Sequence, residues 1–282
     1  MRIQHWIKNL FLFAALIFSA RLFEVQDVII TLKGFFLFSF AASGIYIFND
    51  IADVERDKLH PVKSRRPLPS GKLSVSVAWV CAIFLIPGSI IAAFYQNLGF
   101  GITLLLYAVL NVAYSLKLKD IVILDVMTIS TGFVLRVVGG ALLISVGASE
   151  WLIICTILLS LFLGFSKRRH EITILESEAN PHRAVLEHYS PYFLDQMIGI
   201  VTASTVMSYA LYTISEETVK KFGTSHLIYT VPFVLYGIFR YLYLVHKKIE
   251  GGNPTKVAVT DRPLLINIIL WIVSVSLIIY RR

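Results

Sequence analysis

The chain has 282 residues, of which 56% are hydrophobic and only 16% are charged, and its formal net charge is +8. A soluble protein of this length would carry far more charge on its surface, so the composition excludes a soluble globular domain and indicates an integral membrane protein. The apolar runs lack the alternating pattern of outer-membrane strands. We therefore predict an all-α polytopic bundle that forms one membrane domain over residues 1–282.

Apolar runs of about 20 residues predict membrane-spanning helices. In chain order the sequence offers about nine of them: 9–24, 28–48, 74–95, 99–115, 121–144, 150–166, 193–214, 225–245 and 263–280. The first run is short and resembles a signal peptide, but it continues a regular series of spans, so we interpret it as a span.

Lys and Arg residues gather in the N-terminal segment and in the loops after the second, fourth, sixth and eighth runs. The positive-inside rule therefore places the N-terminus and these loops in the cytoplasm and the C-terminus outside. The long loops all fall on this predicted cytoplasmic side. We accordingly expect a multi-pass protein of the inner (plasma) membrane whose active site faces the cytoplasm.

An acidic cluster, "NDIADVERDKLHP", follows the second run. If the helix continues past the membrane edge, Asp50, Asp53 and Asp57 share one face, with Asn49 on the flank of Asp53. Like charges on one face repel each other, and oxygen-only ligands favour a hard cation such as Mg²⁺. The alternative is a solvated helix end with surface ion pairs, but charges at the end of a span are costly and usually functional. The pattern predicts a magnesium site formed by these four residues.

Basic residues follow the acidic cluster directly, in "HPVKSRRPLPSG". When Mg²⁺ neutralises part of a diphosphate, Lys and Arg side chains bind the remaining oxygens, and arginine does so with two hydrogen bonds. Lys63 and Arg66 are the candidates for this contact. The two segments together predict a magnesium–diphosphate site at the membrane surface.

The segment between the fourth and fifth spans carries five further candidate residues: Tyr114, Lys117, Lys119, Asp125 and Arg136. Asp125 and Arg136 lie about three helical turns apart, so they share a face that points into the bundle. An arginine inside a span must find an acid or a phosphate. Two interpretations of Arg136 stay open, a tether to Asp125 or Asp50 and a contact with the substrate.

Three consecutive bases end the sixth span: Lys167, Arg168 and Arg169. Because they are consecutive they fan around the helix, and at least one should face a cavity. Glu171 binds either a second ion or one of these arginines. Arg183 is a candidate phosphate contact, with a positive-inside anchor as the alternative. Asp261, before the last span, is either an N-cap or part of the site.

The quoted motifs carry a resemblance over essentially the whole chain. "NDIADVERD" after the second of nine predicted spans resembles the UbiA superfamily of intramembrane prenyltransferases. A typical member has a second aspartate-rich motif after the sixth span, where this sequence has "SKRRHE". That departure argues against ordinary prenyl transfer. The sequence is instead similar to the decaprenyl-phosphate phosphoribosyltransferase branch, in "SKRRHE" and in "QHWIKN", "HPVKSRRP", "YSLKLKDIVILDV" and "GFVLR".

The resemblance implies transfer of a 5-phosphoribosyl group from phosphoribosyl diphosphate to a polyprenyl phosphate, with Mg²⁺ as cofactor. Asp50, Asp53, Asp57 and Arg136 are then the expected catalytic residues, and Lys8 with Arg136 orients the acceptor phosphate. We expect Lys117, Lys167, Arg168 and Arg169 to bind the 5-phosphate or the remaining negative charge of the donor. We expect the bilayer and these two substrates as partners and no nucleic acid, while the sequence indicates no oligomeric state. A role in cell-envelope biosynthesis follows only from the resemblance.

Two alternatives stay open. The first is a prenyltransferase that moves a prenyl group from prenyl diphosphate to an aromatic or other acceptor. The second is a non-enzymatic lipid-binding or transport protein, for which broken helices with polar residues in mid-membrane are typical. The polar residues of this chain gather instead at one predicted face of the membrane, which favours chemistry at the interface.

Overall fold

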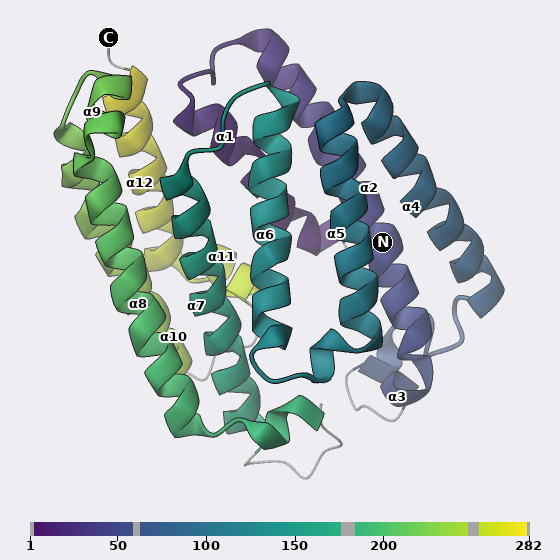
Figure 1. The fold of residues 1–282 in the computed structure, drawn as a ribbon. Helices are drawn as coiled ribbons and strands as arrows, with labels where there is room; N and C mark the ends of the chain where they lie inside the picture. The colour runs from purple at the N-terminus through teal and green to yellow at the C-terminus, as the bar shows by residue number, and fades with distance from the viewer. Residues whose placement is uncertain (1–2, 59–62, 176–183, 248–253, 281–282) are drawn as a thin grey trace. The chain divides into compact units, whose positions relative to one another are not determined.

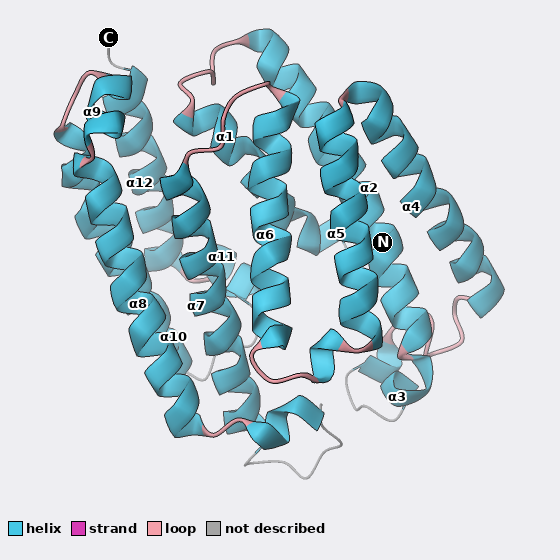
Figure 2. Ribbon diagram, in the orientation of Figure 1, coloured by secondary structure: helices cyan, strands magenta, loops and turns pink. Residues whose placement is uncertain are grey.

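The computed structural model describes residues 3–58, 63–175, 184–247 and 254–280 (Figure 1). Within these ranges every regular element is a helix, and the connections are turns and short loops (Figure 2). The all-α prediction is therefore confirmed. Long apolar sequences adopt this structure in a bilayer because a helix satisfies all its own backbone hydrogen bonds.

Eight helices among the described residues are long and apolar enough to cross a membrane. They are α2 (Val25–Ala52), α4 (Val75–Gln96), α5 (Leu98–Leu116), α6 (Leu124–Leu143), α7 (Glu150–Leu175), α8 (Pro191–Ile214), α10 (Val231–Lys247) with the preceding 3₁₀ helix η5 (His226–Thr230), and α12 (Arg262–Tyr280). The chain is thus a multi-pass integral membrane protein.

The first of the nine predicted spans is not a long helix. Residues 3–18 form the 3₁₀ helix η1 (Ile3–Leu12) and the short helix α1 (Phe13–Phe18), after which the chain turns at Ala20 with φ +60°. The prediction of nine spanning helices is therefore corrected to eight within the described ranges. The polar sequence around Ser19 and Arg21 ends the helix early, because the chain reverses there to begin α2.

Although it is short, the N-terminal segment lies antiparallel along α2. The indole nitrogen of Trp6 donates to the Ser43 hydroxyl at 3.1 Å, and the amide of Asn9 donates to the Ser39 hydroxyl at 2.9 Å. Edge-to-face contacts between Trp6 and three phenylalanines of α2 add to this packing. The segment therefore begins beside the acidic end of α2.

Contacts divide the chain into two compact units: residues 1–148 with 179–185, and residues 149–178 with 186–282. In the first unit, α2 packs on α4, α5 packs on α6, and the N-terminal segment packs on α6. Its core includes the buried side chains of Phe38, Ile45, Phe100 and Leu104. Small residues allow the close approaches, as at Gly140, whose Cα faces the backbone of Leu12.

In the second unit α7 packs on α8, and α10 packs on α12. Shorter helices complete it: η4 (Ala184–His188), which begins in the first unit, α9 (Glu216–Phe222) and α11 (Pro254–Thr260). Asp261 accepts a hydrogen bond from the backbone N–H of Leu264 at 3.0 Å. Its two carboxylate oxygens also accept from Nε and Nη2 of Arg240, at 3.0 and 2.8 Å. Of the two interpretations of Asp261, the N-cap is the one observed.

Replacing Gly140 by alanine is expected to destabilise the first unit. A Cβ at this position would overlap the backbone carbonyl of Leu12, which cannot move aside as a flexible side chain would. We expect a loss of about 1–3 kcal/mol, typical of overpacking, read as a lower thermal unfolding temperature in detergent. Gly88→Ala is the matched control, because a Cβ there meets nothing within 4 Å. Equal unfolding temperatures for the two variants would contradict the packing described here.

Candidate active site at the end of α2

The acidic motif lies where α2 ends and a second short helix begins. α2 ends at Ala52, Asp53 has φ −100° and ψ 7°, and α3 continues over Val54–Lys58. Helical backbone hydrogen bonds still join the two, from Asp53 to Asn49 at 3.0 Å and from Asp57 to Asp53 at 2.8 Å. The predicted extension of the helix past the apolar run is confirmed, with a break at Asp53.

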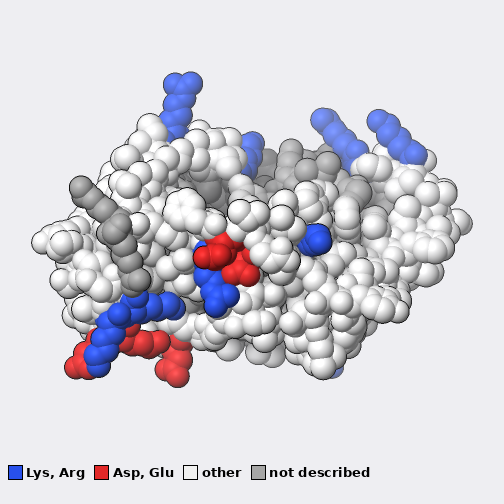
Figure 3. All heavy atoms as spheres, turned by 90° about the horizontal axis from the view of Figure 1, so that it is seen from above, with Lys and Arg blue, Asp and Glu red and all other residues white. Residues whose placement is uncertain are grey.

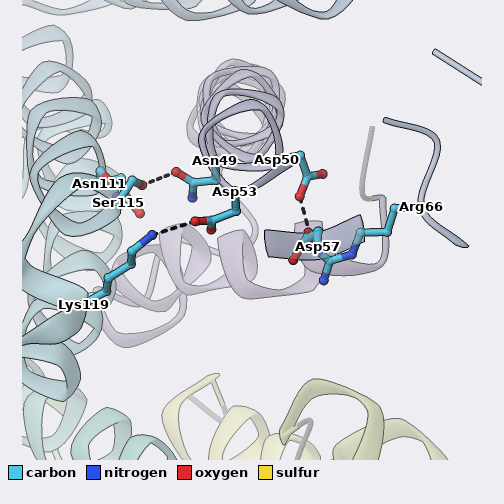
Figure 4. A network of polar contacts seen from close by, with 8 residues as sticks. All are labelled: Asn49, Asp50, Asp53, Asp57, Arg66, Asn111, Ser115 and Lys119. Carbon is cyan, nitrogen blue, oxygen red and sulfur yellow. Dashed lines mark hydrogen bonds and ion pairs between the residues drawn. The ribbon is translucent and has the colours of Figure 1, made fainter. Parts of the chain in front are cut away.

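Each carboxylate of the motif has a basic partner within the first unit (Figure 4). One guanidinium nitrogen of Arg66 lies 2.6 Å from Asp57 and 3.3 Å from Asp50. The ammonium of Lys119 lies 2.8 Å from Asp53. The expectation of one shared face is thus corrected, since Asp50 and Asp57 converge on Arg66 while Asp53 turns toward Lys119.

Among the described residues, no three His, Cys, Asp or Glu side chains stand in a metal-binding group. The donors nevertheless fit Mg²⁺, which prefers oxygen ligands and is usually bound by one or two carboxylates beside substrate phosphates. The side chains of Asp50 and Asp53 are 17% and 34% exposed, whereas that of Asp57 is only 5% exposed. Asp50 and Asp53 are therefore the accessible candidates for the ion, and Asp57 is suited to hold Arg66.

A polar row on α5 and the following turn supports the other side of the motif. Ser115 donates to the side-chain oxygen of Asn49 and also contacts the backbone carbonyl of Asn111, at 2.7 Å. Lys119, in the 3₁₀ helix η3 (Leu118–Asp120), is 7% exposed. Ser115 was not predicted as a site residue, although Asn111 and Ser115 are two polar residues one turn apart near the end of a span, which is a usable signal.

Arg136 is buried in α6, with 4% of its surface exposed. It donates to the side-chain oxygen of Asn9 at 2.7 Å, to the carbonyl of Gly132 at 2.7 Å and to the hydroxyl of Tyr107 at 2.9 Å. Its guanidinium carbon also lies 4.6 Å from the ring centroid of Tyr107 and 5.1 Å from that of Phe38.

The predicted tether of Arg136 to Asp125 or Asp50 is not formed. Within the described part of the chain no carboxylate lies in ion-pair distance of Arg136, and its hydrogen-bond partners are neutral. Asp125 is fully buried in the first turn of α6. Asn9 and Tyr107 were not predicted as partners of Arg136, although Asn9 is a polar residue at the edge of an apolar run.

In the second unit, the three bases in the C-terminal third of α7 fan around the helix as predicted. Arg168 is 1% exposed and lies 2.6 Å from Glu171, and Lys167 lies 3.6 Å from the same carboxylate. Arg169 points elsewhere and donates to Asp195 at 2.9 Å. Of the two interpretations of Glu171, its pairing with an arginine is the one observed.

The remaining predicted site residues differ in their exposure to solvent, and some lie outside the described residues. Lys8 and Tyr114 are partly buried and Lys117 is exposed. The side chain of Lys63 and the whole of Arg183 lie outside the described residues. The structure therefore assembles two groups, each within one unit: Asn49, Asp50, Asp53, Asp57, Arg66 and Lys119 in the first, and Lys167, Arg168 and Glu171 in the second.

The end of the first unit where α2 begins has a different character. Figure 3, seen from above Figure 1, shows scattered Lys and Arg side chains and only small groups of acidic side chains. An ion pair at the start of α2, Arg21 with Asp27, has an arginine that is 45% exposed. The buried, mutually paired charges of the first unit are thus found at the other end of α2.

The sequence matches the model of the UbiA prenyltransferase family over residues 10–171, and the chain belongs to that family. This match covers the acidic motif, Arg136 and the bases of α7. A UbiA homolog from Archaeoglobus fulgidus bound to GPP and Mg²⁺ has the same fold, with a TM-score of 0.73 at 20% identity over 99% of this chain and 97% of that one.

Two curated relatives extend along nearly the whole chain. The decaprenyl-phosphate phosphoribosyltransferase of Corynebacterium glutamicum is 31% identical, over 99% of this chain and 85% of the relative. The enzyme of the same name from Mycolicibacterium smegmatis is 28% identical, over 99% of this chain and 91% of the relative. The resemblance inferred from the motifs is therefore confirmed, and the chain is a transferase of the UbiA family.

Because Arg66 neutralises Asp50 and Asp57, we expect its removal to strengthen the binding of a divalent cation. Arg66→Met should tighten Mn²⁺ binding by threefold to tenfold, on the order of 1 kcal/mol for a partly exposed ion pair. Mn²⁺ titration of the purified protein by electron paramagnetic resonance measures this. Arg21→Met, which removes the ion pair at the other end of α2, is the matched control. Unchanged or weaker binding in Arg66→Met would show that the cation does not use these carboxylates.

Proposed function

We propose that the protein transfers the 5-phosphoribosyl group of phosphoribosyl diphosphate to a polyprenyl phosphate and releases diphosphate. The observation that carries this proposal is the basic group Lys167–Arg169 in the C-terminal third of α7, where a typical family member would have a second acidic motif for a second magnesium ion. A donor with one diphosphate and one further phosphate needs one acidic site and one basic site. The near full-length similarity to decaprenyl-phosphate phosphoribosyltransferases supports the same reading.

The donor diphosphate is assigned to the end of α2. Mg²⁺ held by Asp50 and Asp53, with Asn49 as a further oxygen ligand, would neutralise the leaving diphosphate. Arg66 and Lys119 already stand beside these carboxylates, at 3.3 and 2.8 Å, and supply N–H donors for the remaining diphosphate oxygens. Asp57 keeps Arg66 in place from its buried position.

The bond that breaks joins C1 of the ribose to the diphosphate, and the bond that forms joins C1 to an oxygen of the lipid phosphate. Departure of the diphosphate leaves an oxocarbenium-like carbon, which nearby negative charge stabilises. The lipid phosphate is already anionic at neutral pH, so its attack requires positioning rather than a general base. We assign to Arg136, which no described carboxylate neutralises, a positive potential that favours anionic substrates.

A direct test uses purified protein in lipid nanodiscs with labelled phosphoribosyl diphosphate and a polyprenyl phosphate. We expect a labelled lipid product that disappears on removal of Mg²⁺ by EDTA. Asp53→Asn should lower kcat/KM by about a hundredfold or more, as for loss of a group that binds charge in the transition state. Asp27→Asn at the opposite end of α2 is the matched control and should keep its activity. No labelled lipid in the wild type, or product formed from geranyl diphosphate instead, would refute the proposal.

The role of Arg136 can be separated from its contribution to stability. Asn9→Asp places a carboxylate against the guanidinium, which should preserve or raise the unfolding temperature while neutralising the positive potential. If that potential serves the substrates, kcat/KM falls by about tenfold or more, equivalent to about 1.4 kcal/mol.

Tyr107→Phe is the matched variant, because it removes one hydrogen bond to Arg136 and keeps the charge. It should cost about 1–2 kcal/mol of stability and leave kcat/KM within a few fold. Full activity in Asn9→Asp would assign Arg136 to the structure of the bundle alone.

A further inference from the structure

Ser115 on α5 has two hydrogen-bond neighbours and one proton to share between them. It is 6% exposed, and its hydroxyl lies 2.7 Å from the backbone carbonyl of Asn111 and touches the side chain of Asn49. If the amide oxygen of Asn49 faces Ser115, both neighbours are acceptors, but a serine hydroxyl donates only one hydrogen bond. One of these acceptors is then left without the serine proton, which is unfavourable at a buried position.

Other helical hydroxyls of the chain show how such a group is satisfied. Ser43 donates to the carbonyl of Ser39 at 2.8 Å and accepts from the indole nitrogen of Trp6 at 3.1 Å. Thr173 donates to the carbonyl of Arg169 at 3.0 Å and accepts from the guanidinium of the same residue at 2.6 Å. An indole N–H and a guanidinium can only donate. In both cases, therefore, the hydroxyl gives its proton to the carbonyl one turn earlier and accepts a hydrogen bond at its other side.

At Ser115 the same pattern requires a donor from Asn49, and the amide can supply one. The two ends of an amide have nearly the same shape, so the hydrogen bonds around them decide which end faces a neighbour. With its nitrogen toward Ser115, Asn49 donates to the hydroxyl oxygen and the serine proton goes to Asn111, so that both contacts of Ser115 are hydrogen bonds. In the opposite orientation the amide nitrogen of Asn49 donates to none of the described residues. The hydrogen bonds therefore favour the nitrogen toward Ser115.

This orientation decides which atom Asn49 presents to the acidic motif. Asn49 and Asp53 lie one helical turn apart, and in Figure 4 the end of the amide that does not face Ser115 projects on the side of Asp53. With the nitrogen toward Ser115, that end is the oxygen, which Mg²⁺ accepts as a ligand. With the oxygen toward Ser115, that end would be an NH₂ group, which has no lone pair to offer a cation.

We propose that Ser115 is a positioning residue for the cation: it accepts from the amide nitrogen of Asn49 and so turns the amide oxygen toward the ion held by Asp50 and Asp53. The inference rests on the proposed function, in which Asn49 is an oxygen ligand of Mg²⁺. A group that holds a metal ligand by a hydrogen bond commonly changes the metal affinity by about tenfold or more when it is removed. Ser115 does not itself touch the ion in this arrangement, so its effect passes through Asn49.

The test is a Mn²⁺ titration of the purified full-length protein, followed by electron paramagnetic resonance. Ser115→Ala should weaken Mn²⁺ binding by about tenfold, and Ser115→Thr, which keeps the hydroxyl, should bind like the wild type. In protein that already carries Asn49→Ala, the same Ser115→Ala change should have no further effect, because the residue through which it acts is gone.

Ser89→Ala is the matched control and should bind Mn²⁺ like the wild type. Ser89 is also 6% exposed and also donates to the carbonyl one turn earlier, at 2.6 Å, but it lies in the middle of α4. The pair separates loss of a buried helical hydroxyl in general from loss of the contact with Asn49.

Three results would each overturn the inference: wild-type binding in Ser115→Ala, binding by Ser115→Thr as weak as by Ser115→Ala, or additive losses in the double variant. Additive losses would mean that the hydroxyl acts on the ion independently of Asn49. Mn²⁺ binding requires neither the donor nor the lipid. The expected binding pattern in a protein that forms no phosphoribosyl lipid would therefore refute the proposed function and leave the role of Ser115 intact.

Discussion

The arrangement at the end of α2 depends on one constraint, the cost of holding charges at the edge of a hydrocarbon layer. Asp57 and Lys119 have little contact with solvent, and an unpaired charge in such a place costs several kcal/mol. Pairing Asp57 and Asp50 with Arg66 ties the segment after α3 to the helix end. Pairing Asp53 with Lys119 ties the turn after α5 to the same place. The ion pairs thus assemble one site from three separate stretches of the first unit.

The same constraint has a different solution at Arg136. Inside the bundle the guanidinium is satisfied by an amide, a hydroxyl, a backbone carbonyl and aromatic faces, with no carboxylate among the described residues. Neutral partners leave the positive charge in place, whereas an acid would cancel it. Asn9 also links this cluster to α2 through Ser39, so the short N-terminal segment is held by polar contacts as well as by packing. The positive charge of Arg136 is therefore not cancelled by any carboxylate among the described residues that contact it.

Much of the fold was predictable because a spanning helix is a local property of about 20 apolar residues. Eight of the predicted spans correspond to such helices, and the acidic motif was placed correctly at the end of α2. The prediction of a spanning helix over residues 9–24 was wrong because the chain reverses at Ala20, and composition does not reveal such a reversal. The partners of Arg136 and Arg169 could not be predicted because Asn9, Tyr107 and Asp195 are distant from them in sequence. Many other neutral or acidic residues of the chain could have served as partners equally well. The orientation in the membrane and the single catalytic domain stay predictions.

Charge balance links the two groups of residues to the chemistry. At the end of α2 the acids Asp50, Asp53 and Asp57 exceed the bases Arg66 and Lys119 by one, a balance that attracts a divalent cation rather than a bare phosphate. On α7 the bases Lys167, Arg168 and Arg169 exceed their acidic partners Glu171 and Asp195 by one, and this excess is complementary to a phosphate monoester, whose charge is about −1.5 to −2 at pH 7. A prenyl diphosphate and a neutral acceptor would offer this second group no anion. A reaction that brings a further phosphate, on the sugar or on the lipid, gives both groups a partner of matching charge.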